Sequence, residues 1–140
     1  MEARLPSRIV CLTEETTETL YRIGEADRIV GISGFTVRPP QARKEKPRVS
    51  AFTSARIDRI LALSPDLVLG FSDLQADIAQ ELIRQGVSVM VFNHRSVNGI
   101  LDMMKTLGAM VGALERTESL IAQCQANLDR ARRQAPPVRP

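Results

Sequence analysis

The chain has four phenylalanines, and each lies at or just beyond the carboxyl end of a stretch whose apolar pattern predicts a β-strand. Hydroxyl, carboxylate, amide, imidazole and guanidinium groups stand beside them. An edge that combines apolar rings with hydrogen-bonding groups is suited to holding a sizeable organic ligand. The residues that could form it are Thr13, Glu14, Ser33, Phe35, Thr36, Phe52, Thr53, Ser54, Phe71, Ser72, Asp73, Phe92, Asn93, His94 and Arg95.

Several of these side chains also have a simpler structural explanation. The hydroxyls of Thr13, Ser54 and Ser72 fit helix capping at least as well as ligand contact, because such an oxygen accepts a backbone N–H at the start of a helix. Phe92 fits core packing better than ligand contact. The other three phenylalanines fit either role.

Groups that could carry out catalysis are few. His94 is the only histidine, and it follows a predicted strand beside Arg95, where Asp73 could reach it. No glycine-rich phosphate loop or nucleophile elbow follows any strand. Cys11 and Cys124 occupy apolar positions and are expected to be small buried residues. We therefore expect a protein that is not an enzyme and has no metal site or cofactor of its own.

The elements that would position these residues are clearest in the middle of the chain. Residues 66–70 and 88–92 are short apolar runs, typical of strands that are covered on both faces. Ser72 and Gln75 have the spacing of a capping box, and Gly86 can end the helix between the strands. A right-handed crossover of this kind places the start of the helix at the carboxyl edge, where open α/β sheets bind ligands. The predicted apolar stripe of this helix is Leu74, Ile78, Leu82 and Ile83.

The first part of the chain follows the same scheme. Thr13 is placed to cap a helix that Gly24 ends, and Thr53 or Ser54 to cap a helix that stops before Pro65. The stretch of residues 33–47 has no helical or alternating period and is expected to be a loop. Further strands are predicted at residues 8–12, 28–32 and 49–52.

Two amphipathic helices are expected to close the chain, the second beginning near Ala113 and ending before Pro136. The predicted fold is a three-layer, Rossmann-like α/β lobe, with a mostly parallel sheet of about four or five strands and a long carboxyl-terminal helix. Self-association through that helix is possible, because its apolar face has little to lie against. The face consists of Leu120, Ile121, Cys124, Leu128 and Ala131.

Composition narrows the class of partner. The 140 residues, 44% hydrophobic and 25% charged, suit one soluble globular domain. The net charge of +3 gathers at the carboxyl end, and no recognition motif for nucleic acid accompanies it, so we expect no nucleic-acid partner. No apolar segment has the roughly 20 residues of a membrane span. No signal region precedes the first strand, so the chain is either cytoplasmic or the mature form of an exported protein.

Several segments carry a resemblance to a known family. They are RIVCLTEETTETLYRIG, with TE after the first strand; the PP of the second loop; PRVSAFTSARIDRILALSPDLVLG, with LxPDLVL; and the pattern G-V-x-V-x-V-F-N. Together these segments resemble the amino-terminal lobe of the periplasmic binding proteins that deliver cobalamin and ferric siderophores to ABC importers. The cobalamin-binding branch is the most similar.

The resemblance implies a two-lobed protein with the ligand between the lobes and one long helix joining them. Residues 1–112 would be the amino-terminal ligand-binding lobe, and residues 113–140 the interlobe helix and the start of a missing second lobe. The ligand would be cobalamin or a related metal chelate, such as a siderophore or haem, and the protein would be periplasmic or extracytoplasmic. The implied ligand-facing residues are Phe35, Thr36, Phe52, Thr53, Phe71, Ser72, Asp73, Asn93, His94 and Arg95.

The resemblance also implies a partner, the permease of an ABC importer, with Asp73 or Asp77 as the docking residue. The alternative function is a small Rossmann-like enzyme or regulatory domain that binds a nucleotide at the same edge. A nucleotide needs a glycine-rich turn after the first strand, whereas this chain has Thr13, Glu14 and Glu15 there. Those acids repel phosphate, so they favour a transport protein over a nucleotide-binding domain.

Overall fold

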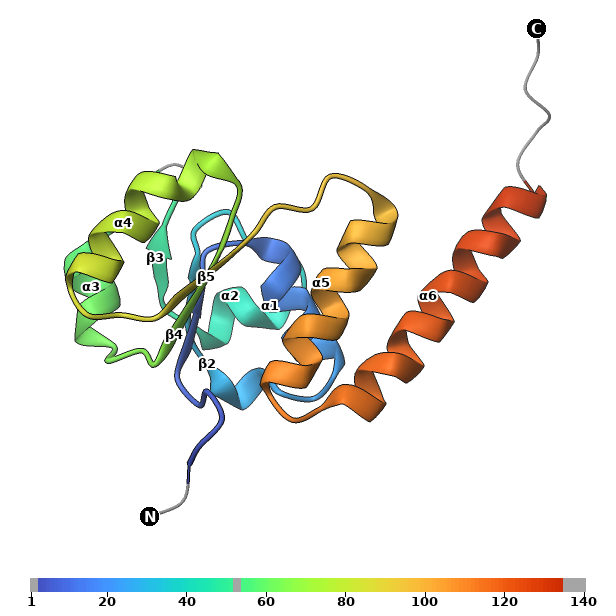
Figure 1. Cartoon of the computed structure of the whole chain (residues 1–140), viewed down its shortest axis with the longest axis horizontal. Coiled ribbons are helices and arrows are strands. Elements are labelled where there is room, and N and C mark those ends of the chain that lie inside the picture. Colours follow the sequence, from blue (N-terminus) through green and yellow to red (C-terminus); the bar gives the residue numbers. More distant parts are fainter. Residues whose placement is uncertain (1–2, 52–53, 135–140) are drawn as a thin grey trace, which may run out of the picture.

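A computed structural model describes residues 3–51 and 54–134 of the protein. Its centre is a five-stranded sheet in the order β3-β2-β1-β4-β5, and every pair of neighbouring strands is parallel (Figure 1). The predicted α/β fold with a parallel sheet is therefore confirmed. The strands are β1 (Ile9–Cys11), β2 (Ile29–Ser33), β3 (Arg48–Ser50), β4 (Leu67–Phe71) and β5 (Val89–Phe92).

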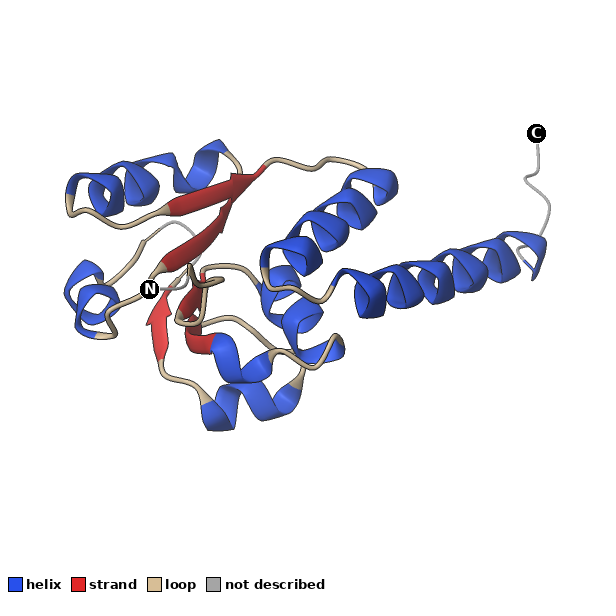
Figure 2. Cartoon of the chain, turned by 60° about the horizontal axis from the view of Figure 1, so that its bottom comes forward, coloured by secondary structure: helices blue, strands red, loops and turns tan. Residues whose placement is uncertain are grey.

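Helices cover both faces of the sheet, which explains why the strands are apolar almost throughout. Ile9 and Cys11 of β1 pack on one side, in a core shared with Leu20 and Leu107, and Val10 packs on the other with Ile60. The first face carries α1 (Glu14–Arg22), α2 (Pro40–Glu45) and α5 (Val97–Met110), and the second carries α3 (Ile57–Ala62) and α4 (Ala76–Arg84) (Figures 1 and 2). Short 3-10 turns, η1 (Ala26–Arg28) and η2 (Asp73–Gln75), precede β2 and α4.

Two local predictions about helices are wrong. The stretch expected to be a loop contains α2, because Pro40 has a backbone angle that suits the first turn of a helix and Ala42 is buried against the core. Helix α3 begins after Arg56 without a side-chain cap, so Ser54 does not cap it, and Thr53 lies outside the described residues.

The predicted stripe on α4 is half right. Ile78 and Leu82 are buried as expected, but Leu74 and Ile83 are 61% and 60% exposed. Leu74 is exposed because the α-helix begins only at Ala76, after the 3-10 turn. The helix contacts the sheet through the narrower face of Ile78, Ala79 and Leu82.

Gly112, with a φ of +72°, ends α5 and lets the chain turn into α6 (Leu114–Gln134). The first turn of α6 is fixed to the rest of the lobe by close packing and a hydrogen bond. Thr117 is buried so close to Gly108 that a side chain at position 108 would overlap it, and Arg116 donates a hydrogen bond to Glu25. The Glu25 carboxylate also accepts from Arg28 at 2.8 Å. Burial opposes the charge of Glu25, but these two hydrogen bonds outweigh it and lower its pKa.

The far end of α6 extends away from the rest of the chain (Figures 1 and 2). Leu120, near the base of the helix, is buried, whereas Leu114 is 40% exposed. Cys124 and Leu128 are half-buried, and the residues from Asp129 to Gln134 are exposed. Self-association through this helix stays a prediction. No helix of the described residues is long and apolar enough to cross a membrane.

Candidate ligand-binding site

The candidate site follows from the order of the strands. After β1 the chain continues to β2 on one side, and after β4 it continues to β5 on the other, although β1 and β4 are neighbours. The loops after these two strands therefore diverge, which leaves a crevice at the carboxyl ends of β1 and β4. Open α/β sheets bind ligands at this topological switch point.

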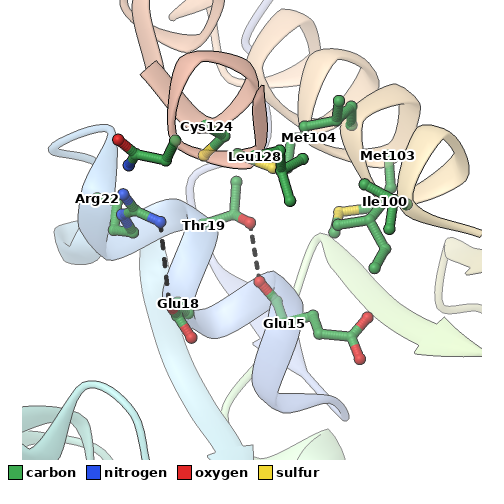
Figure 3. Close-up of a pocket in the computed structure, with 12 residues that line it drawn as sticks. Glu15, Glu18, Thr19, Arg22, Ile100, Met103, Met104, Cys124 and Leu128 are labelled. Atoms are coloured by element: carbon green, nitrogen blue, oxygen red, sulfur yellow. Dashed lines mark hydrogen bonds and ion pairs between the residues drawn. The ribbon is translucent and has the colours of Figure 1, made fainter. Parts of the chain in front are cut away.

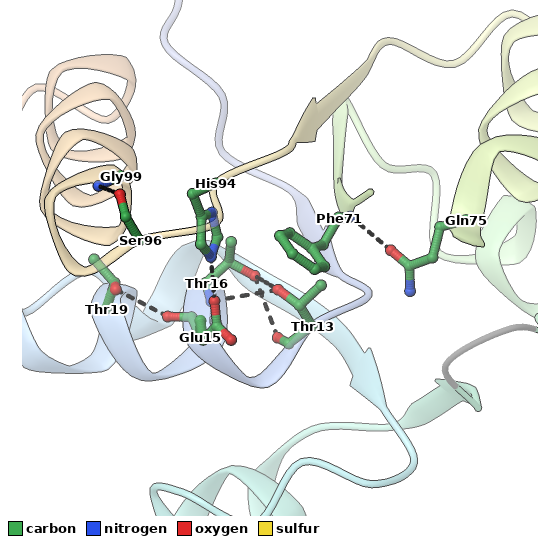
Figure 4. Close-up of polar contacts among 9 residues, drawn as sticks. All are labelled: Thr13, Glu15, Thr16, Thr19, Phe71, Gln75, His94, Ser96 and Gly99. Carbon is green, nitrogen blue, oxygen red and sulfur yellow. Dashed lines mark hydrogen bonds and ion pairs between the residues drawn. The ribbon is translucent and has the colours of Figure 1, made fainter. Parts of the chain in front are cut away.

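Gln75 connects the ends of β1 and β4 across the crevice, and Figure 4 shows its contact with Phe71. Its amide nitrogen donates to the carbonyl of Leu12 at 3.1 Å, and its amide oxygen accepts from the N–H of Phe71 at 2.7 Å. The side chain is 1% exposed. The sequence assigned Gln75 to a capping box with Ser72, which is wrong. Ser72 instead donates its N–H to Phe92 at 2.8 Å, and its hydroxyl accepts from Leu74.

Phe71, His94 and Glu15 meet above this bridge (Figure 4). The rings of Phe71 and His94 lie 4.6 Å apart at an angle of 45°. Nε2 of His94 lies 2.6 Å from a carboxylate oxygen of Glu15, although the two residues are 79 positions apart in the chain. The His94 side chain is only 10% exposed, whereas that of Glu15 is 53% exposed. The loop after β5 is thereby tied to the first turn of α1.

Glu15 is a site residue that the sequence analysis missed. The sequence placed Glu14 among the candidate edge residues, whereas Glu15 was interpreted only as an acid that repels phosphate. Glu14 has a second function as well, since its carboxylate accepts the N–H of Val37 at 2.8 Å and so holds the loop after β2. A carboxylate directly after a cap, at the end of a central strand, was the available signal.

Two predicted site residues lie inside the protein instead of at its surface. Thr36 is fully buried and shares a 2.6 Å hydrogen bond with the hydroxyl of Ser33, so it shapes the loop. Ser72 is buried and has a φ of +62°, a left-handed conformation that is unfavourable for serine. Thr13 caps α1 through its hydroxyl, as its structural explanation predicted.

The remaining predicted residues form an exposed polar margin. Arg95 donates to the amide oxygen of Asn93 at 3.2 Å and lies 4.0 Å from a carboxylate oxygen of Asp73. Phe35 is 39% exposed on the loop after β2, and Asp77 is exposed in the first turn of α4. Phe52 and Thr53 lie outside the described residues. The structure thus gathers Phe71, Asp73, Asn93, His94 and Arg95 at one edge.

A second hollow opens beside this edge, where α6 diverges from α1 and α5 (Figure 3). It has a volume of about 400 Å³, with Glu18 and Arg22 among its charged residues. Glu15 belongs both to this hollow and to the His94 cluster. The sequence could not predict the hollow, because it depends on the angle at which α6 leaves the lobe. Its apolar lining comprises Val97, Ile100, Leu101, Met103, Met104 and Leu128.

The chemistry of these groups favours binding. Burial raises the pKa of Cys11 to about 11, so its thiol stays protonated and is a poor nucleophile. Within residues 3–51 and 54–134 there is no group of three or more histidine, cysteine, aspartate or glutamate residues that could hold a metal ion. Rings beside amide, carboxylate and guanidinium groups can hold a polar organic molecule with an extended apolar face.

The chain belongs to the periplasmic binding protein family, whose model matches residues 9–138. Among curated relatives it is similar to the vitamin B12-binding protein of Pectobacterium carotovorum, with 24% identity over 129 residues. That alignment covers 91% of this chain and 46% of the relative.

Solved structures of the family share the fold. The periplasmic vitamin B12 binding protein of Vibrio cholerae has a TM-score of 0.81 and 25% identity, over 92% of this chain and 51% of that one. A periplasmic haem binding protein from Pseudomonas aeruginosa has a TM-score of 0.83 and 25% identity, over 90% of this chain and 46% of that one. This chain therefore spans about half the length of the relatives it matches.

The bridge across the crevice can be tested by removing the Gln75 side chain. Gln75→Ala leaves the carbonyl of Leu12 and the N–H of Phe71 buried without this partner, so we expect the free energy of unfolding to fall by about 1–3 kcal/mol. Urea denaturation measures the loss. Gln80→Ala, at an exposed position of α4, is the control and should change stability by less than about 0.5 kcal/mol. Equal effects of the two changes would contradict the bridging role.

Proposed function

We propose that this chain is the amino-terminal lobe of the substrate-binding component of an ABC importer, and that its carboxyl edge binds cobalamin or a related metal chelate. The observation that carries the proposal is the meeting of Phe71 and His94 at the switch point between β1 and β4. Similar chains of the same family are a vitamin B12-binding protein and a haem binding protein, which supports this ligand class.

The edge has the chemistry that such a chelate requires. A corrin or porphyrin ring offers a wide apolar face, and the half-buried ring of Phe71 can pack against it. The rim of a corrin carries amide groups, and the rim of a haem carries carboxylates. Asn93 and Arg95 are exposed beside Phe71 and can hydrogen-bond to either kind of group.

A nucleotide-binding enzyme or regulatory domain is not favoured. Phosphate binds best to the free N–H groups of a helix N-terminus. At the start of α1, the hydroxyl of Thr13 already accepts one of these groups, the N–H of Thr16. Glu14 and Glu15 place two carboxylates in the same turn. The family relatives named above are binding proteins, which agrees with a chain that binds its ligand without changing it.

The names of the relatives support an extracytoplasmic location, since two of the similar solved chains are periplasmic proteins. We propose the same location for this chain. Its partner would then be the permease that receives the ligand.

Binding by this chain should be weak, because a ligand between two lobes makes only part of its contacts with one of them. We expect a Kd for cyanocobalamin above about 1 µM, which corresponds to a binding free energy weaker than about −8 kcal/mol. Phe71→Ala should weaken binding further by about 1 kcal/mol, or roughly fivefold, because the aromatic contact is lost. Titration followed by the absorbance of the corrin measures both values.

Leu5→Ala is the control for this experiment, since it removes an exposed apolar side chain that precedes β1, at the opposite edge of the sheet. It should leave the Kd unchanged. A Kd that Phe71→Ala leaves unchanged would contradict ligand binding at this edge. A submicromolar Kd would contradict the division of the ligand between two lobes.

We also propose that Asp73 and Asp77 contact arginine or lysine residues of the permease. Both carboxylates are exposed, that of Asp73 in η2 and that of Asp77 in the first turn of α4. The double reversal Asp73→Lys and Asp77→Lys should slow association with the reconstituted importer by about tenfold or more at low salt and leave the melting temperature unchanged. Surface plasmon resonance gives the rates. Glu81→Lys, later on the same helix, is the control, and equal slowing by this variant and by the double reversal would contradict a specific contact.

A further inference from the structure

His94 is the one imidazole of the chain, and it lies at the edge where a metal chelate would bind. An imidazole is a common ligand of haem iron and of other transition metals. The groups around the ring determine whether His94 is available to bind the metal.

Neither ring nitrogen is available to bind a metal. Nδ1 is buried and has no hydrogen-bond partner among the residues that the structure describes. Nε2 lies 2.6 Å from the Glu15 carboxylate, which can only accept a hydrogen bond when it is ionised, so Nε2 carries the proton. A nitrogen that carries a proton has no lone pair for a metal. Glu15 therefore selects the tautomer in which Nε2 cannot bind a metal ion.

Packing holds the ring in this position. Phe71 lies against one side of it, and Gly99 of α5 approaches so closely that a Cβ there would lie 2.9 Å from the Cβ of His94. The ring cannot turn easily toward solvent while Glu15 anchors its far end. Only 10% of the His94 side chain is exposed.

We infer that Glu15 keeps His94 from coordinating the metal, so that this lobe selects a chelate whose axial positions are already occupied. The inference rests on the proposed function and narrows its substrate class. Cobalamin fits this class, because its cobalt carries its own nitrogen base and an upper ligand. Haem with an open axial position does not gain a ligand from this edge.

Coordination by His94 would need three changes. The Nε2 proton would have to move to Nδ1 through solvent, the hydrogen bond to Glu15 would have to break, and a water molecule would have to leave the metal so that the Nε2 lone pair could replace it. Without Glu15, no carboxylate favours the tautomer protonated at Nε2, and in the tautomer protonated at Nδ1 the Nε2 lone pair is available to the metal. Removal of Glu15 should therefore create a metal ligand.

The probe is aquocobinamide, a corrinoid that lacks the nitrogen base and has exchangeable water on cobalt. It is titrated in mildly alkaline buffer. Exchange of water for imidazole shifts its visible absorption bands, and free imidazole provides the reference spectrum. All proteins carry Cys124→Ser, so that this half-buried thiol does not compete for cobalt.

We expect the imidazole spectrum with Glu15→Ala and not with the parent protein, and the apparent affinity of Glu15→Ala for aquocobinamide should be about tenfold higher or more, because a bond to the metal is gained. The double variant Glu15→Ala, His94→Ala should lose the effect. Glu15→Gln keeps an acceptor oxygen and should behave like the parent. Glu18→Ala removes a neighbouring acid that pairs with Arg22 and Arg38 instead, and it should also behave like the parent.

An imidazole spectrum with the parent that disappears in His94→Ala would overturn the inference, as would a folded Glu15→Ala protein that gives none. Circular dichroism confirms the fold of each variant. Titration of the same proteins with cobalamin tests the proposed function separately. If cobalamin binds to none of them, the proposed function fails, and the cobinamide spectra still decide the role of Glu15.

Discussion

The structure depends on one constraint, the divergence of the chain after two neighbouring strands. Strands β1 and β4 are paired along their length, yet the loops that follow them turn to opposite sides of the sheet. Gln75 joins their ends with two hydrogen bonds in a place that is closed to solvent. The crevice beyond it is where Phe71, His94 and Glu15 meet, so the site is a consequence of the topology.

The fold could be predicted because its signals are local. Short apolar runs, Gly24 and Gly86 after helices and Thr13 before one mark most of the elements. The predictions of helices and burial were wrong where contacts in the folded structure determine the conformation. Pro40 begins a helix inside an apparent loop because Ala42 finds a place in the core. Leu74 is exposed because the chain first makes a 3-10 turn.

The site could be predicted only in part, and for the same reason. The rule that residues directly after parallel strands lie at the same edge of the sheet correctly placed Phe71 and His94 together. It does not show which way a side chain turns, so Thr36 was expected at the surface although it is buried against Ser33. Nor does it show pairs that are far apart in the chain. The partnership of Glu15 with His94 needs the loop after β5 to lie over α1, which only the packed structure reveals.

The central claim is that the carboxyl edge of this sheet binds a metal chelate, and a map of the amide resonances tests it most directly. Cyanocobalamin added to the ¹⁵N-labelled chain should shift the resonances of residues 13–15, 71–73 and 93–96, which surround the switch point. The amides of α3 and the start of β3, at the opposite edge, should not move. Shifts confined to that opposite edge, or no shifts at millimolar ligand, would contradict the account.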